Sequence, residues 1–147
     1  MKQKDLNVIS NFLRKIKINK IKNRETKIAL INIHLALYKK VEEWQSDLEE
    51  LQKKFFEGKE QELALYNQKV QEIQSTPADQ QSALVEQLNP EMKSLVSEFN
   101  SIVEGMLMRE VPIEFEKVNE QDFIEALIDL DIEFTCDDLI VLKDLYK

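Results

Sequence analysis

The chain has 147 residues, of which 43% are hydrophobic and 33% are charged, and its formal net charge is −8 at pH 7. This length suits one domain, or one domain with an appendage, and the composition allows a core beneath a strongly charged surface. With two glycines and three prolines, sandwiches, barrels and glycine-dependent nucleotide-binding folds are disfavoured, because tight turns need residues that tolerate positive φ. One cysteine and one histidine exclude an internal disulfide and the usual multi-histidine metal sites.

Charge is unevenly distributed along the chain. Residues 1–27 carry a net charge of +7, whereas residues 111–147 carry −8. Two such ends can each attract an external partner, or they can face one another. We expect solvated faces and mutual attraction between the two ends.

The first segment, residues 1–23, contains a predicted basic amphipathic helix over residues 4–22. Apolar residues recur there at spacings of three and four, which is typical of one helix face packed on a core. That stripe consists of Leu6, Ile9, Leu13 and Ile16. The opposite face is basic and would contact phosphates of a nucleic acid if it is free. The residues of this basic patch are Arg14, Lys15, Lys17, Lys20 and Lys22.

The stretch from Arg24 to Gln74 predicts a long helix with one weak point at Gly58. Glycine inside a helix is about 1 kcal/mol less favourable than alanine, so we expect a register defect or a break there. From Ile28 to Tyr38 apolar side chains occur on almost every side, and we expect several neighbours to enclose that part. The apolar stripe is Ile28, Ile31, Leu35, Tyr38, Val41, Trp44, Leu48, Leu51, Phe55, Leu63, Tyr66, Val70 and Ile73.

Two sequence signals after this helix predict new helix starts. Ser75-Thr76-Pro77 and Asn89-Pro90 each combine a capping residue with a proline, which is favoured in the first helical turn. If the chain reverses at 75–77, Pro90 lies level with the irregular stretch after Gly58. Residues 24–110 are therefore predicted to form a long antiparallel, coiled-coil-like helical hairpin.

The third segment, residues 111–147, is acidic and has a different pattern. Apolar and polar residues alternate over 111–118, which predicts a short strand or extended segment. Asn119 and Thr135 are each followed three positions later by an aspartate, and this spacing predicts two helix starts. We expect a helix–loop–helix subdomain here.

Together these segments predict a mainly α fold, in which the hairpin extends from a small helical bundle. The bundle would contain residues 1–38, the end of the returning arm and the acidic tail. The most apolar stretch, residues 28–38, is too short to cross a bilayer, and charged residues interrupt any secretory signal near the start. We expect a protein without a transmembrane segment and with a cytoplasmic location.

Candidate catalytic and metal-binding residues are few. We expect His34 to be packed or hydrogen-bonded within the bundle, because a di-iron Glu-x-x-His turn would need a glutamate where Ile31 stands. Cys136 is expected to be an incidental thiol, since neighbouring aspartates oppose its ionisation.

A calcium loop is the remaining candidate. The acid-rich stretch over 129–140 has the layout of an EF-hand, but Phe134 replaces the required glycine and Ile140 replaces the bidentate glutamate. We therefore expect no catalytic residue, no cofactor and no metal, and hence no enzymatic activity.

The function that these features predict is that of a non-catalytic assembly or adaptor protein, which forms a homo-oligomer or docks on a larger complex. A small viral or mobile-element accessory protein would suit this description. The predicted interface consists of Trp44, Leu48, Leu51, Phe55, Phe56 and Phe99. Two alternatives remain open: an acidic regulator whose tail imitates nucleic acid, and a nucleic-acid binder that uses the basic first helix.

Overall fold

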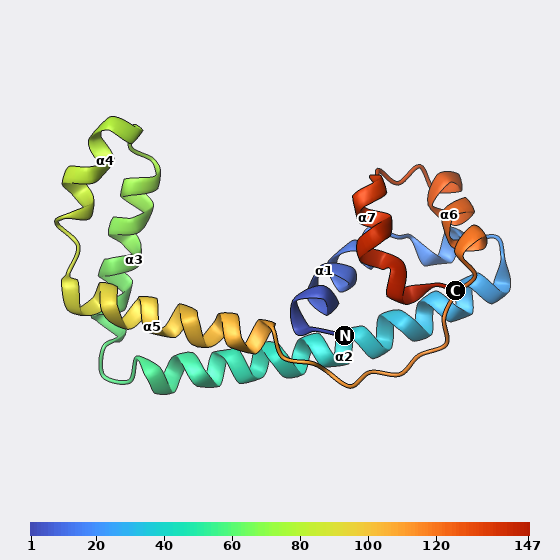
Figure 1. Ribbon diagram of the computed structural model, residues 1–147, viewed down its shortest axis with the longest axis horizontal. Helices are drawn as coiled ribbons and strands as arrows, with labels where there is room; N and C mark the ends of the chain where they lie inside the picture. The colour runs from blue at the N-terminus through green and yellow to red at the C-terminus, as the bar shows by residue number, and fades with distance from the viewer. The chain divides into compact units, whose positions relative to one another are not determined.

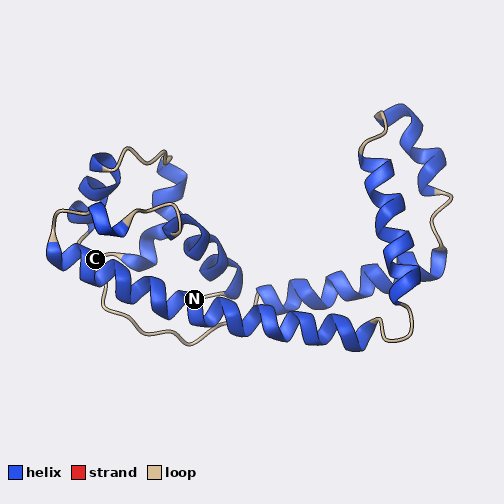
Figure 2. Ribbon diagram, turned by 180° about the vertical axis from the view of Figure 1, so that it is seen from behind, coloured by secondary structure: helices blue, strands red, loops and turns tan.

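The computed structural model describes all 147 residues and has an all-α fold. Figure 2 shows helices joined by loops, with no strand. The chain forms two compact units: Met1–Gln45 with Leu107–Lys147, and Ser46–Met106. The predicted mainly helical fold is confirmed, whereas the division into segments 1–23, 24–110 and 111–147 stays a prediction.

The first unit places three short α-helices against the part of α2 that ends at Gln45 (Figure 1). Its elements are α1 (Gln3–Leu13), the 3-10 helix η1 (Ile18–Lys20), α2 (Arg24–Phe55), α6 (Glu120–Asp129), α7 (Cys136–Val141) and the 3-10 helix η2 (Leu142–Leu145). Buried apolar residues of α1, α2, α6 and η2 form a shared core, and the partly buried Ile18 of η1 and Leu139 of α7 pack against it.

The core of this unit is built from one face of each main helix. On α2 the buried residues Leu30, Ile33 and Leu37 follow spacings of three and four, so they lie on the same side of the helix. The fully buried side chains of the core are Leu6, Ile9, Leu13, Leu30, Ile33, Leu37, Phe123, Leu127, Leu142 and Leu145.

The first helix is shorter than predicted, because α1 ends at Leu13 instead of near residue 22. Ile16 and Ile21 still enter the core, but through a turn and η1 instead of a continuous helix. Asn23 then caps α2, since its Oδ1 accepts hydrogen bonds from the backbone N–H groups of Glu25 at 3.0 Å and Thr26 at 3.2 Å. Such a cap stabilises a new helix start.

The C-terminal segment is extended over 111–117 and forms no strand. Backbone hydrogen bonds join it to both ends of the chain: the N–H of Val111 donates to the carbonyl of Met1 at 2.8 Å, and that of Val118 to the carbonyl of Leu145 at 2.9 Å. The chain then enters α6, where Asn119 Oδ1 accepts from the N–H of Asp122 at 3.1 Å. This predicted cap is confirmed.

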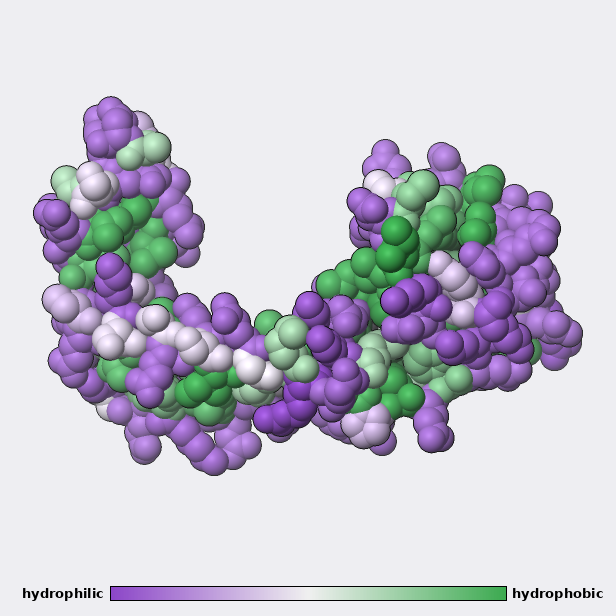
Figure 3. Space-filling model, in the orientation of Figure 1, coloured by the Kyte–Doolittle hydropathy of each residue, from purple (hydrophilic) through white to green (hydrophobic).

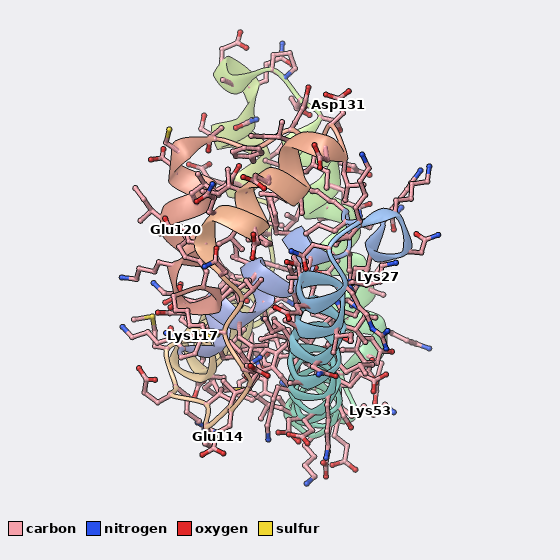
Figure 4. All side chains as sticks on the ribbon, turned by 90° about the vertical axis from the view of Figure 1, so that its right-hand side faces the viewer. Lys27, Lys53, Glu114, Lys117, Glu120 and Asp131 are labelled. Carbon is pink, nitrogen blue, oxygen red and sulfur yellow. The ribbon has the colours of Figure 1, made fainter.

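The last helix begins with a reciprocal cap. Thr135 Oγ1 accepts from the N–H of Asp138 at 3.2 Å, and Asp138 Oδ2 accepts from the N–H of Thr135 at 2.8 Å. This is a capping box, as the spacing predicted. Asp131 makes the turn before it with φ 54°, and Figure 4 shows its position at the end of α6.

The second unit contains the end of α2 and three further helices: α3 (Glu60–Gln74), α4 (Ala78–Val85) and α5 (Pro90–Leu107). The predicted break at Gly58 is confirmed, because α2 ends at Phe55 and Gly58 has φ 77°. Glycine adopts this left-handed conformation without a steric penalty. Lys59 Nζ and Glu91 Oε1 form an ion pair at 2.7 Å within this unit.

The two helix starts predicted in this unit, at α4 and α5, differ in whether a side chain caps them. Asn89 caps α5 as expected, since its Oδ1 accepts from the N–H of Glu91 at 3.0 Å. The expectation that Thr76 caps the helix after it is wrong: Thr76 Oγ1 donates to the carbonyl of Glu72 at 2.7 Å, and no side chain caps α4. This carbonyl lies in the last turn of α3, where backbone partners run out, and it also accepts a hydrogen bond from Ser75 Oγ at 3.1 Å.

Residues 24–110 thus form four helices in place of two long arms. The chain reverses between α3 and α4, which lie side by side (Figure 1). The antiparallel, coiled-coil-like packing of a hairpin over 24–110 stays a prediction.

Candidate protein interaction surface

An apolar stripe faces solvent along the first half of α2. Ile28, Ile31, Leu35 and Tyr38 are 48%, 39%, 60% and 40% exposed. They follow spacings of three, four and three, so they adjoin one another on one helix face. We call these four residues the α2 stripe.

The expectation that neighbours enclose residues 28–38 on all sides is wrong. The core elements cover only the side of α2 that carries Leu30, Ile33 and Leu37, and the α2 stripe lies on the other side. Ile28 lines a depression together with Val118 of the C-terminal segment. A single exposed apolar residue needs no explanation, but a contiguous row of four is a candidate interaction surface.

The charged residues that border the α2 stripe include Arg24, Glu25, Lys39 and Glu42 on α2 itself. All four are exposed, and none forms an ion pair within the chain. The stripe therefore has a polar border whose charges are available to an external partner.

Tyr38 and His34 form the polar edge of the stripe. The Tyr38 hydroxyl donates to Glu42 Oε1 at 2.6 Å, and this hydrogen bond, with the negative charge of Glu42, raises the pKa of Tyr38. The His34 ring is stacked on Tyr38 with 6.3 Å between ring centroids. His34 Nδ1 is buried without a hydrogen-bond partner, as is Trp44 Nε1.

The interface residues predicted from the sequence lie further along the chain. Trp44, Leu48 and Leu51 are half-buried on α2. Phe55, Phe56 and Phe99 pack together, with ring centroids 5.1 to 5.6 Å apart.

These aromatic rings form part of the second unit's core, in which Phe56 is only 3% exposed. Beside Phe56 lies an open groove of about 450 Å³, lined also by Leu63 and Ala64. Figure 3 shows apolar side chains reaching the surface of each unit.

The basic patch is exposed at every predicted position: Arg14, Lys15, Lys17, Lys20 and Lys22. Lys15 Nζ lies 5.7 Å from the centroid of the Phe12 ring, a cation–π contact. The expected attraction to the acidic tail produces no ion pair, because the four ion pairs of the structure join other residues. The patch departs from the predicted helical face, since these residues lie between α1 and α2, where the chain forms a turn and the short η1.

The histidine, cysteine and acidic side chains form no metal-binding cluster. No group of three or more histidine, cysteine, aspartate or glutamate side chains is placed to hold a metal ion. Cys136 is a free, exposed thiol, and Ile140 is 62% exposed. None of the helices combines the length and apolar character needed to cross a membrane.

The chain matches no protein-family model, no curated protein and no solved structure. The α2 stripe was part of the sequence-predicted apolar seam, but its exposure was missed. The signal that would have revealed it is the width of the apolar zone, because a helix that is apolar on two faces has one face left over once the other is buried.

Proposed function

We propose that this protein is a non-catalytic assembly or adaptor protein that binds another protein chain through the α2 stripe. The observation that carries the proposal is the contiguous exposure of Ile28, Ile31, Leu35 and Tyr38. Burying them against a partner would remove apolar surface from water, which is the main driving force of protein association. The charged residues around the stripe supply the polar border of such an interface.

The experiment compares two matched leucine substitutions in the full chain. Leu35 in the stripe and Leu65 on α3 are 60% and 63% exposed, and lysine has a helix propensity close to that of leucine. In extracts of cells that make the protein, the wild type and the Leu65→Lys variant should elute above the monomer mass of 17.3 kDa. The Leu35→Lys variant should elute as a monomer with unchanged helix content.

Two results would contradict the proposal. The first is a wild-type protein that elutes as a monomer in extract at every concentration. The second is a folded Leu35→Lys variant that elutes in extract at the same position as the wild type. Circular dichroism of each variant separates loss of binding from loss of folding.

We further propose that residues 46–106 pack as an antiparallel helical hairpin that is bent at both arms. The Phe55–Phe99 contact, with ring centroids 5.6 Å apart, and the Lys59–Glu91 ion pair support this arrangement. The arms change direction at Gly58, where φ is positive, and at Asn89, where α5 begins. Spin labels at positions 52 and 102 should report a short distance if α2 and α5 run side by side.

Binding of a nucleic acid is a second candidate function. The observation that favours it is that Lys15, Lys17 and Lys20 are exposed and lack ion-pair partners. Phosphate contacts release counterions, so binding should weaken steeply with added salt. The triple substitution to alanine should abolish retention on DNA or RNA. Unchanged retention of the triple variant would contradict this function.

A further inference from the structure

The α2 stripe is symmetric about the level of Ile33. Ile28 and Tyr38 each stand five positions from Ile33, and Ile31 and Leu35 each stand two positions from it. In an antiparallel pair of identical helices related by a two-fold axis, residues equally far from the axis face one another. An axis at Ile33 therefore places Ile28 against Tyr38 of a second copy, and Ile31 against its Leu35.

The charges at the two ends of the stripe obey the same symmetry. Arg24 and Glu42 each stand nine positions from Ile33 and lie on the same helix face as the stripe, since they continue its spacing. The antiparallel arrangement places Arg24 of each copy against Glu42 of the other. Neither residue has an ion-pair partner within the chain, so both contacts are available to a second copy.

A second pair of charges flanks the seam. Glu25, Asn32 and Lys39 recur every seven residues beside the stripe and are all exposed. In heptad terms they occupy the position that flanks the seam and meets its own equivalent when the helices are antiparallel. Glu25 of one copy then lies near Lys39 of the other, with the two Asn32 side chains between these pairs.

A parallel arrangement would lose these attractions. It places Arg24 against Arg24 and Glu42 against Glu42, and like charges at facing positions are destabilising. The charge pattern thus distinguishes between the two orientations, and the apolar pattern alone does not.

We propose that a second copy of this chain packs antiparallel on α2 through the α2 stripe, with Arg24 paired to Glu42 and Glu25 to Lys39 across the seam. The proposal rests on the function proposed above and names its partner. The seam from Arg24 to Glu42 is 19 residues, or about 28 Å, long. With four large side chains at its centre, the seam buries less area than a standard interface of about 800 Å² per partner. We therefore expect the dimer to dissociate on dilution.

Charge reversal tests the pairing in the purified full chain. Arg24→Glu and Glu42→Arg should each raise the dissociation constant at least tenfold, because each places two like-charged pairs across the seam. The double variant restores both attractions and should return the constant to within about threefold of the wild type. Glu98→Arg, an equal change of charge at an exposed site on α5, should leave it unchanged.

Disulfide trapping tests the orientation. In a Cys136→Ser background, Asn32→Cys should form a covalent dimer on mild oxidation, because Asn32 of each copy lies one residue from the axis. Ser46→Cys occupies the same heptad position two heptads further along α2. In the antiparallel pair its two copies are about 39 Å apart and should not cross-link.

The outcomes separate this inference from the proposed function. Equal trapping at positions 32 and 46, or single charge reversals without effect on the dissociation constant, would overturn the antiparallel pairing. A purified chain that stays monomeric, while its elution in extract still depends on Leu35, would overturn self-association but leave the adaptor function standing. A chain that is monomeric both when purified and in extract would overturn self-association and the adaptor function together.

Discussion

Tyr38 donates a hydrogen bond of 2.6 Å to Oε1 of Glu42, one turn further along α2. Both side chains are exposed, and the bond joins the last apolar member of the stripe to the acid at its end. It orients the Glu42 carboxylate beside the stripe, where we propose that Arg24 of a second copy binds.

The Glu42→Gln substitution should lower the pKa of Tyr38 toward its ordinary value. In the wild type, the hydrogen bond to Glu42 and the charge of that carboxylate both favour the protonated hydroxyl. Titration by the ultraviolet absorbance of tyrosinate measures the shift, and a Tyr38→Phe variant identifies which transition belongs to this residue. An unchanged titration curve would show that Glu42 does not control the hydroxyl.

The Lys59–Glu91 ion pair should stabilise the second unit only within a window of pH. Its hydrogen bond lowers the pKa of Glu91 and raises the pKa of Lys59. The contribution of Glu91 is present above its unfolded pKa and is lost as the pH falls through its folded pKa. The contribution of Lys59 is present below its unfolded pKa and is lost as the pH rises through its folded pKa.

Urea unfolding of the Glu91→Gln variant should therefore show a small loss of stability at neutral pH that vanishes in acid. Because both side chains are partly exposed, added salt should shrink the loss as well. A loss that is the same at neutral and acid pH would mean that the ion pair is not its cause.

The two glycines should respond oppositely to alanine. Gly58→Ala should destabilise the protein by about 1 kcal/mol, because an L-residue is strained at φ 77°. Gly105→Ala lies within α5 with no atom within 4 Å of the new methyl group, and should stabilise it by about 0.5 to 1 kcal/mol. Chemical denaturation measures both, and equal signs would contradict the backbone described here.

Removing the side chains of Asn89 and Thr76, the two predicted capping residues on either side of α4, should reduce stability by different amounts. Asn89→Ala should lower the free energy of unfolding by about 1 kcal/mol, since it removes the acceptor for the first N–H groups of α5. Thr76→Ala should have a smaller effect, because its hydroxyl only adds a hydrogen bond to the exposed carbonyl of Glu72. Thermal unfolding of the two variants side by side checks this order, and the reverse order would restore Thr76 as the cap of α4.

The features that could be predicted from the sequence depend on contacts between residues a few positions apart. The caps at Asn119 and Thr135 and the break at Gly58 are of this kind, because their hydrogen bonds or dihedral angles are local. The early end of α1 at Leu13 was missed, since the helical spacing continues to Ile16 even though the backbone leaves the helix.

The candidate surface could be predicted only in part. The apolar character of Ile28, Ile31 and Leu35 is plain in the sequence, but both faces of this helix section are apolar there. Which face is covered depends on α6 and η2, which lie about a hundred residues away in the chain and bring Phe123 and Leu145 to the opposite side. Spacing alone carries no information about that choice.

The mass of the purified full chain, measured by light scattering over a dilution series, tests the central claim most directly. We predict twice 17.3 kDa at high concentration, a fall toward 17.3 kDa on dilution, and 17.3 kDa throughout for Leu35→Lys. A wild-type mass of 17.3 kDa at every concentration would contradict the claim that the exposed stripe of α2 pairs two copies of the chain.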